Sequence, residues 1–202
     1  GEYEPEEYLL NPGKPVAVGP YSASAYVMEA RKNQALAMEH AKEVILEVAK
    51  RFQKISGRSY GFFEEYRTKD ADYIMVLIGS AAGTAKQAVD DLRAKGKKVG
   101  VIKLRVFRPF PAKELAEALK CCKMAAVLDR CESYNGNGGP LGCETDAALF
   151  RNKIRIETVN YIYGLGGRDF TVKEAYEVFR QLEDAVLHGR RPEQYQYIGL
   201  RK

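Results

Sequence analysis

The sequence predicts an α/β protein with three layers, in which helices cover both faces of a mostly parallel sheet. Short apolar runs alternate with amphipathic helical patterns from about residue 70 onward. The run at 73–78 (YIMVLI) is continuously apolar, which is typical of a strand buried on both faces. Glycine or proline closes most of these segments, so their boundaries are also predicted.

Strands are predicted at 73–78, 99–106, 124–128 and 154–162, with helices between them. The first of these helices ends at Gly96, and the second starts with Pro111 at its first position. A Gly-rich irregular stretch at 131–142 leads into a short helix at 143–150. Thr171 and Glu174 have the spacing of a capping box, which predicts the start of the last helix.

Two segments precede this α/β domain, which is expected to cover residues 57–202. Residues 1–30 are rich in proline and glycine and are expected to form an extended arm or linker. Residues 31–56 carry Val44, Val48 and Phe52 at helical spacing, which predicts an amphipathic helix that packs on the core. The chain begins with Gly1 rather than Met, so we expect a processed, tagged or truncated start.

Composition excludes several classes of protein. The net charge is +5, but the basic residues are dispersed among 27 acidic ones, which argues against nucleic acid as a partner. The longest apolar run is far too short to cross a bilayer, so no membrane partner is expected.

The four cysteines are at positions 121, 122, 131 and 143, and none forms a Cys-x-x-Cys pair. Zinc and iron–sulfur sites usually need such pairs, so we expect no metal site in this chain. Reduced thiols and a cytoplasmic location follow as the default expectation. No Ser/His/Asp set or isolated carboxylate pair is visible, so no catalytic residue is predicted.

Two glycine-containing loops are candidates for anion binding. Ligands of parallel sheets lie beyond the carboxyl ends of the strands, where the backbone N–H groups of a helix start can hold an anion. One loop includes Ser80, Gly83 and Thr84, yet it lacks the dinucleotide fingerprint. The alternative is a tight strand–helix turn capped by Ser80.

The second loop, at 164–169, offers Gly166, Gly167 and the guanidinium of Arg168. The alternative is a rigid turn or an interface, because adjacent glycines first of all permit unusual backbone geometry. In that alternative Arg168 and Asp169 pair with neighbouring groups.

A third strand end, at 105–111, presents Arg105, Phe107, Arg108 and Phe110. Arginine and aromatic residues are enriched in interface cores, so this segment is a candidate docking edge. The alternative is packing beneath the helix that follows.

Several motifs together make the chain resemble the α chain of the 2-oxoacid:ferredoxin oxidoreductases, including pyruvate:ferredoxin oxidoreductase (pyruvate synthase). They follow the family's order and cover most of residues 11–172. The matching segments are 11–20 (NPGKPVAVGP), 48–52 (VAKRF), 57–61 (GRSYG), 78–84 (IGSAAGT), 92–93 (LR), 105–111 (RVFRPFP), 128–130 (LDR) and 164–169 (GLGGRD).

The resemblance implies an enzyme that converts a 2-oxoacid and coenzyme A to acyl-CoA, CO2 and reduced ferredoxin. Its cofactors would be thiamine diphosphate, Mg and 4Fe–4S clusters, all held by other domains or subunits. The present chain is similar to the second, carboxyl-terminal domain of the α chain and to the transketolase carboxyl-terminal domain. The family's catalytic residues therefore have no counterparts here.

Two functions are then expected. The first is a non-catalytic assembly domain that contacts the β, γ and δ chains, reaches ferredoxin only through the complex, and is inactive alone. The second is a module that binds a small anion, coenzyme A or a nucleotide at the strand-end loops.

Overall fold

The structure is a computed structural model that describes residues 12, 13, 15, 24–134, 137–190, 193 and 195–201. Most of the arm expected at 1–30 lies outside these described residues. The chain divides into two compact units, 1–40 and 41–202.

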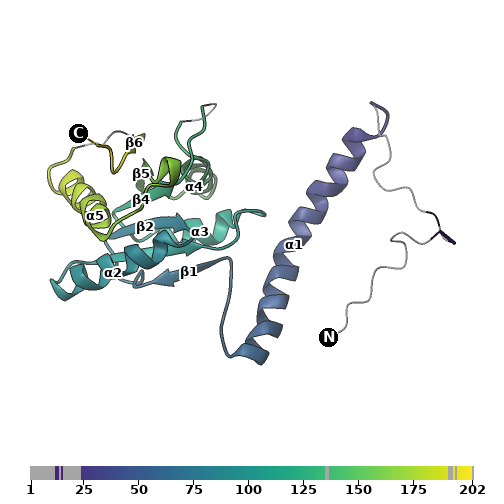
Figure 1. Cartoon of the computed structure of the whole chain (residues 1–202), viewed down its shortest axis with the longest axis horizontal. Coiled ribbons are helices and arrows are strands. Elements are labelled where there is room, and N and C mark those ends of the chain that lie inside the picture. The colour runs from purple at the N-terminus through teal and green to yellow at the C-terminus, as the bar shows by residue number, and fades with distance from the viewer. Residues whose placement is uncertain are drawn as a thin grey trace. The chain divides into compact units, whose positions relative to one another are not determined.

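The second unit contains the sheet, whose strands are joined in the order β1-β3-β2-β4-β5-β6 (Figure 1). Strand β1 is antiparallel to β3, and every other neighbouring pair is parallel. The strands are β1 (Phe63–Tyr66), β2 (Tyr73–Ile78), β3 (Val99–Leu104), β4 (Met124–Asp129), β5 (Glu157–Ile162) and β6 (Tyr195–Tyr197).

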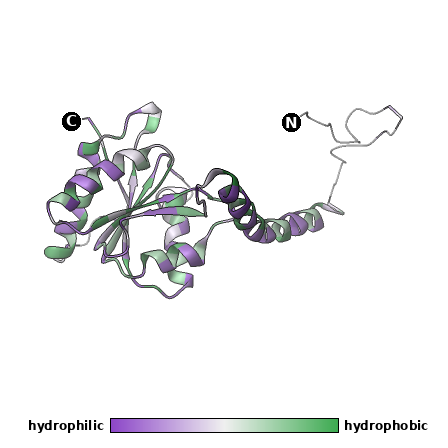
Figure 2. Ribbon diagram, turned by 90° about the horizontal axis from the view of Figure 1, so that it is seen from below, coloured by the Kyte–Doolittle hydropathy of each residue, from purple (hydrophilic) through white to green (hydrophobic). Residues whose placement is uncertain are grey.

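Helices cover both faces of this sheet, as the alternating pattern predicts. Helices α2 (Ala81–Ala94) and α5 (Val172–Leu187) pack on one face, and α3 (Ala112–Leu119) and α4 (Pro140–Arg151) pack on the other. Figure 2 shows the strands between the two helical layers. The central strand β2 is buried over its first five residues, so both of its faces meet apolar side chains.

The capping box at the start of α5 is confirmed. The Thr171 hydroxyl accepts a hydrogen bond from the Glu174 N–H, and the Glu174 carboxylate accepts one from the Thr171 N–H at 2.7 Å. This pair satisfies two of the N–H groups that every helix start leaves unpaired.

The long helix α1 (Val27–Ser56) forms where the apolar spacing predicts it. All 30 of its residues are described, and none of them is buried. Packing of residues 31–56 on the core therefore stays a prediction.

Four local expectations were wrong, and two short strands were missed. Strand β5 begins at Glu157 rather than 154, because its pairing with β4 starts there, opposite Met124. Strands β1 and β6 were not anticipated, because short edge strands lack the long apolar run that marks β2. Helix α4 begins at Pro140 rather than 143, since proline fits a first helical turn. Pro111 is the residue before α3, whose first residue is Ala112. Strand β3 ends at Leu104, two residues earlier than expected.

Candidate functional site

The sheet order creates one natural ligand position, between the carboxyl ends of β2 and β4. From β2 the chain proceeds to β3 on one side, and β4 lies on the other, so the direction of winding reverses there. In doubly wound sheets the crevice at this reversal is where ligands bind. A cavity of about 500 Å³ lies there and is lined by Ser80, Thr84, Arg130, Tyr163, Arg168 and Asp169, among others. We call it the strand-end crevice.

The β2 side of the crevice is the turn into α2. Gly79 has φ +81°, a left-handed conformation that lets the strand turn sharply into the helix. Ser80 occupies the cap position, but its backbone is helical and its side chain makes no cap hydrogen bond within the described residues. The expected capping by Ser80 is therefore wrong, because a side-chain cap requires an extended backbone. Ser80 and Thr84 instead line the cavity.

The β4 side is organised by Asp129, whose side chain is buried. Its carboxylate accepts hydrogen bonds from the N–H groups of Leu141 (3.0 Å) and Gly142 (2.9 Å) and from Asn160 Nδ2 (2.9 Å). The negative charge thus faces the amino terminus of α4, where the helix dipole stabilises it. Asp129 is committed to these hydrogen bonds, and Arg130 is the other charged residue of this strand end.

Arg130 is exposed, and its Nε donates to the Gly164 carbonyl at 3.2 Å. That bond orients the guanidinium beside the cavity, and a guanidinium has five N–H donors in all. Sequence reasoning left Arg130 out of the candidate site. Its position directly after a buried strand was the signal that points to it.

The loop after β5 closes the third side. Gly164, Gly166 and Gly167 all have positive φ (65°, 67° and 86°), so this turn depends on glycine geometry. Arg168 lines the cavity, but its Nη1 donates to the Gly199 carbonyl at 2.5 Å. Arg168 therefore also fastens the chain that follows β6 to the domain.

Of the six predicted anion-loop residues, three line the crevice and three do not. Ser80, Thr84 and Arg168 border the cavity, whereas Gly83 lies in the first turn of α2 and Gly166 and Gly167 shape the loop after β5. Cys131 also borders the cavity, where desolvation and the nearby Asp129 carboxylate raise the pKa of its thiol. A thiol shifted this way is a weak nucleophile at neutral pH.

The arginine–aromatic segment lies beyond the carboxyl end of β3. The rings of Phe107 and Phe110 are edge to face, 5.9 Å apart, and both pack against the core beneath α3. Arg108 stays half exposed, lies over the Phe107 ring at 4.3 Å, and pairs with Glu144 at 2.5 Å.

The side chain of Arg105 is less exposed than that of Arg108, at 25% against 50%. It pairs with Glu64 at 2.8 Å, and its guanidinium lies 4.8 Å from the centre of the Tyr60 ring. A hydrogen bond from Lys86 is the main reason that the pKa of Glu64 is lowered, with Arg105 contributing. The two phenylalanines thus support the domain itself, and Arg108 is the more accessible part of the expected docking edge.

The cysteines are spread over different surroundings. Cys121 is exposed whereas its neighbour Cys122 is buried, so the two side chains point to different sides as expected. Within the described ranges no three His, Cys, Asp or Glu side chains gather in a group that suits a metal ion. None of the described helices is both long and apolar enough to span a membrane.

Comparison with known proteins decides the family. Residues 71–175 match the family described as pyruvate:ferredoxin oxidoreductase core domain II. The chain belongs to this family. It is 40% identical, over its whole length, to the pyruvate synthase subunits PorA of Thermotoga maritima and Pyrococcus furiosus. It is also 40% identical, over 93% of its length, to the ketoisovalerate oxidoreductase subunit VorA of Pyrococcus horikoshii.

This domain II chain spans about half the length of these curated relatives: 50% of each PorA subunit and 48% of VorA. Among solved structures, it is similar to a 2-oxoglutarate:ferredoxin oxidoreductase from Magnetococcus marinus, with TM-score 0.46 and 19% identity over 65% of this chain and 21% of that one. A split-gene transketolase matches with TM-score 0.45 and 17% identity, over 58% of this chain and 40% of that one.

Proposed function

We propose that this chain is a non-catalytic assembly domain of a cytoplasmic 2-oxoacid:ferredoxin oxidoreductase, with pyruvate as the 2-oxoacid. The parent enzyme would convert the 2-oxoacid and coenzyme A to acyl-CoA, CO2 and reduced ferredoxin. Thiamine diphosphate, Mg and 4Fe–4S clusters would be held by its other domains and subunits. Similarity to PorA subunits over the whole chain, and to VorA over 93% of it, supports this assignment.

The observation that carries the assembly role is an apolar stripe on α1. Val44, Val48, Phe52 and Ile55 lie within about 80° of one another around the helix, since each residue advances about 100°. Their exposed fractions are 55%, 52%, 40% and 86%. An exposed row of large apolar side chains marks a surface that a partner covers. We assign it to contact with another part of the oxidoreductase.

Co-purification tests this role. The chain is produced with the remaining subunits of its oxidoreductase, and the affinity-tagged complex is analysed by size exclusion. Val48→Asp should reduce recovery of the complex at least fivefold. Gln53→Asp adds the same charge on the opposite side of the helix and should leave recovery unchanged. Equal recovery for both variants, or no complex with the wild-type chain, would refute the assignment.

A second function is supported by the strand-end crevice. Arg130, two hydroxyl groups and the start of α2 surround a cavity at the reversal point of the sheet. This set suits a phosphate or carboxylate group, including those of coenzyme A or a nucleotide. Asp169 also borders the cavity and limits the total negative charge of such a ligand.

Calorimetric titration with phosphate, coenzyme A and thiamine diphosphate tests the crevice. Heat of binding that disappears in Arg130→Gln, but persists in the exposed control Arg155→Gln, would support it. A flat response of the wild-type chain to all three compounds would eliminate this second function. The assembly role would be unaffected, because it depends on α1.

A further inference from the structure

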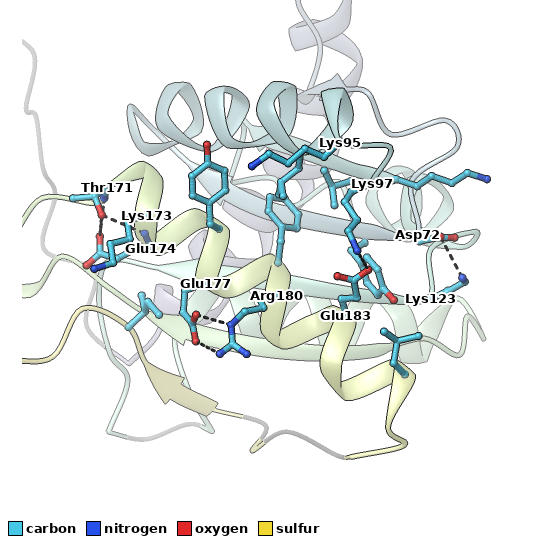
Figure 3. Close-up of a pocket in the computed structure, with 18 of the residues that line it drawn as sticks. Asp72, Lys95, Lys97, Lys123, Thr171, Lys173, Glu174, Glu177, Arg180 and Glu183 are labelled. Atoms are coloured by element: carbon cyan, nitrogen blue, oxygen red, sulfur yellow. Dashed lines mark hydrogen bonds and ion pairs between the residues drawn. The ribbon is translucent and has the colours of Figure 1, made fainter.

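A large groove runs along the outer side of α5, on the face of the sheet that α2 and α5 cover (Figure 3). Its lining extends from Thr171, before α5, to Leu187 at the helix end, which is roughly 24 Å at 1.5 Å per residue. Residues 95–99 and 198–200 form its other walls. We call it the α2–α5 groove. Its volume of about 1240 Å³ exceeds the roughly 300–1,000 Å³ of ordinary small-molecule sites.

The groove is lined by more basic side chains than acidic ones. Four carboxylates line it, and each already has a partner within the domain. Glu183 accepts from Lys97 at 2.6 Å, and Asp72 pairs with Lys123 at 3.2 Å. Glu177 pairs with Arg180 at 2.6 Å, and Glu174 completes the capping box. Three of the four acidic groups are therefore paired with cations of the domain itself, and the fourth, Glu174, is held by hydrogen bonds from Thr171.

Three further lysines line the groove: Lys95, Lys98 and Lys173. Among the described residues, no carboxylate oxygen lies within 4.0 Å of any of these three amino groups. Lys95 lies over the Tyr176 ring, 5.9 Å from its centre, and Figure 3 shows it on the α2 side, facing α5. Positive charge is thus left over around the groove, beyond what the domain itself neutralises.

The groove also exposes apolar surface. Leu187 and Leu200 both line it, and each is 69% exposed. Phe179 also lines the groove but is buried, and Ile198 is half-buried beside the core. Exposed large apolar side chains beside unpaired charge are typical of a surface that another protein covers.

We propose that the α2–α5 groove docks an acidic, amphipathic segment of another subunit of the oxidoreductase. Carboxylates of that segment pair with Lys95, Lys98 and Lys173, and its apolar side chains cover Leu187 and Leu200. A nucleic acid is disfavoured, because its phosphates gain nothing from the exposed leucines, whereas apolar side chains of a protein segment can cover them. The inference rests on the proposed assembly role and names a second contact surface, separate from α1.

Zero-length crosslinking tests the chemistry of this contact directly. The co-expressed complex is treated with a carbodiimide, which joins lysine amines to carboxylates that touch them, and the products are mapped by mass spectrometry. We expect crosslinks from Lys98 and Lys173 to Asp or Glu residues of another subunit. A complex that forms but gives no crosslink from any of the three groove lysines overturns the inference, and the assembly role stands.

Two matched pairs of variants measure how much the groove contributes to the affinity of this chain for the other subunits of the complex. The double variant Lys98→Glu and Lys173→Glu should raise the dissociation constant at least tenfold, whereas Lys113→Glu, on α3, should change it less than twofold. Leu187→Asp should act like the double variant, with Phe150→Asp, on α4 and 85% exposed, as its control. Wild-type affinity in both groove variants refutes the docking site.

The remaining outcomes are also informative. A labelled DNA 20-mer that binds the wild-type chain and not the lysine double variant would overturn the inference in favour of nucleic acid. Failure of the wild-type chain to join any complex would refute the proposed function and the groove inference together. Loss of the complex in Val48→Asp, with groove variants at full affinity, would refute the groove alone.

Discussion

Replacing Asp129 with asparagine alters one atom of a buried carboxylate that connects three parts of the domain. The carboxylate ends β4, receives the first N–H groups of α4, and accepts a hydrogen bond from Asn160 of β5. In Asp129→Asn one oxygen becomes an amino group. The least disruptive rotamer keeps the bonds to Gly142 and Asn160 and turns the amino group toward the Leu141 N–H, where two donors then face each other.

The expected loss of stability follows from these contacts. A hydrogen bond to a charged group contributes about 1.5–3 kcal/mol, and a buried donor left unpaired costs about 1–3 kcal/mol. Loss of the negative charge at the start of α4 removes a further 0.3–1 kcal/mol or so. Because the variant no longer buries a charge, part of this loss is offset. We expect a net decrease of about 2 kcal/mol, or roughly 4–8 °C in Tm for a domain of this size.

Thermal unfolding followed by circular dichroism at pH 7 measures the effect, with urea unfolding as a second measurement. Asp169→Asn is the matched control, because Asp169 borders the same crevice but is exposed. The control should change the free energy of unfolding by less than about 0.5 kcal/mol. A Tm for Asp129→Asn within 1 °C of the control would refute the structural role of this carboxylate.

Three other predictions concern single residues. Gly83→Ala should raise the free energy of unfolding by about 0.5–1 kcal/mol in urea, because Gly83 lies in α2 and no described atom is within 4 Å of the added Cβ; a loss of stability would contradict this. Lys86 lowers the pKa of Glu64 below 4.5. The ion pair between them therefore stabilises the folded state fully above about pH 4.5, and this stabilisation is lost as pH falls through the folded-state pKa of Glu64. The difference in unfolding free energy between wild type and Glu64→Gln should therefore be below about 1 kcal/mol at pH 7 and vanish in acid, and an unchanged difference at pH 3 would count against the ion pair. Burial raises the pKa of Cys122 to about 12, so iodoacetamide at pH 8 should label the exposed Cys121 and spare Cys122, as peptide mapping would show.

The core of the fold was predictable because its signals are local. The continuously apolar run at 73–78 predicts a buried strand from its own residues. Thr171 and Glu174 mark a helix start within four residues. Strands β1 and β6 escaped prediction, because four and three residues of mixed polarity become strands only when β3 and β5 offer them hydrogen-bonding partners.

The candidate site was only partly predictable. Glycine-rich loops identified Ser80, Thr84 and Arg168, which the structure does bring to one cavity. Nothing in the sequence shows that Arg168 also binds the Gly199 carbonyl, 31 residues later. Likewise, Asp129 and Arg130 are neighbours in a strand end, but only the folded chain turns one toward α4 and leaves the other at the crevice.

The sequence by itself therefore determined the fold class, the long helix and the family, because apolar periodicity and motif order are properties of adjacent residues. The tertiary structure decided which polar groups are available. Asp129 accepts hydrogen bonds from the start of α4. Three carboxylates of the α2–α5 groove form ion pairs with Lys97, Lys123 and Arg180. Apart from Glu177 and Arg180, which are neighbours on α5, these groups are far apart in the chain, and only folding brings them to distances of about 3 Å.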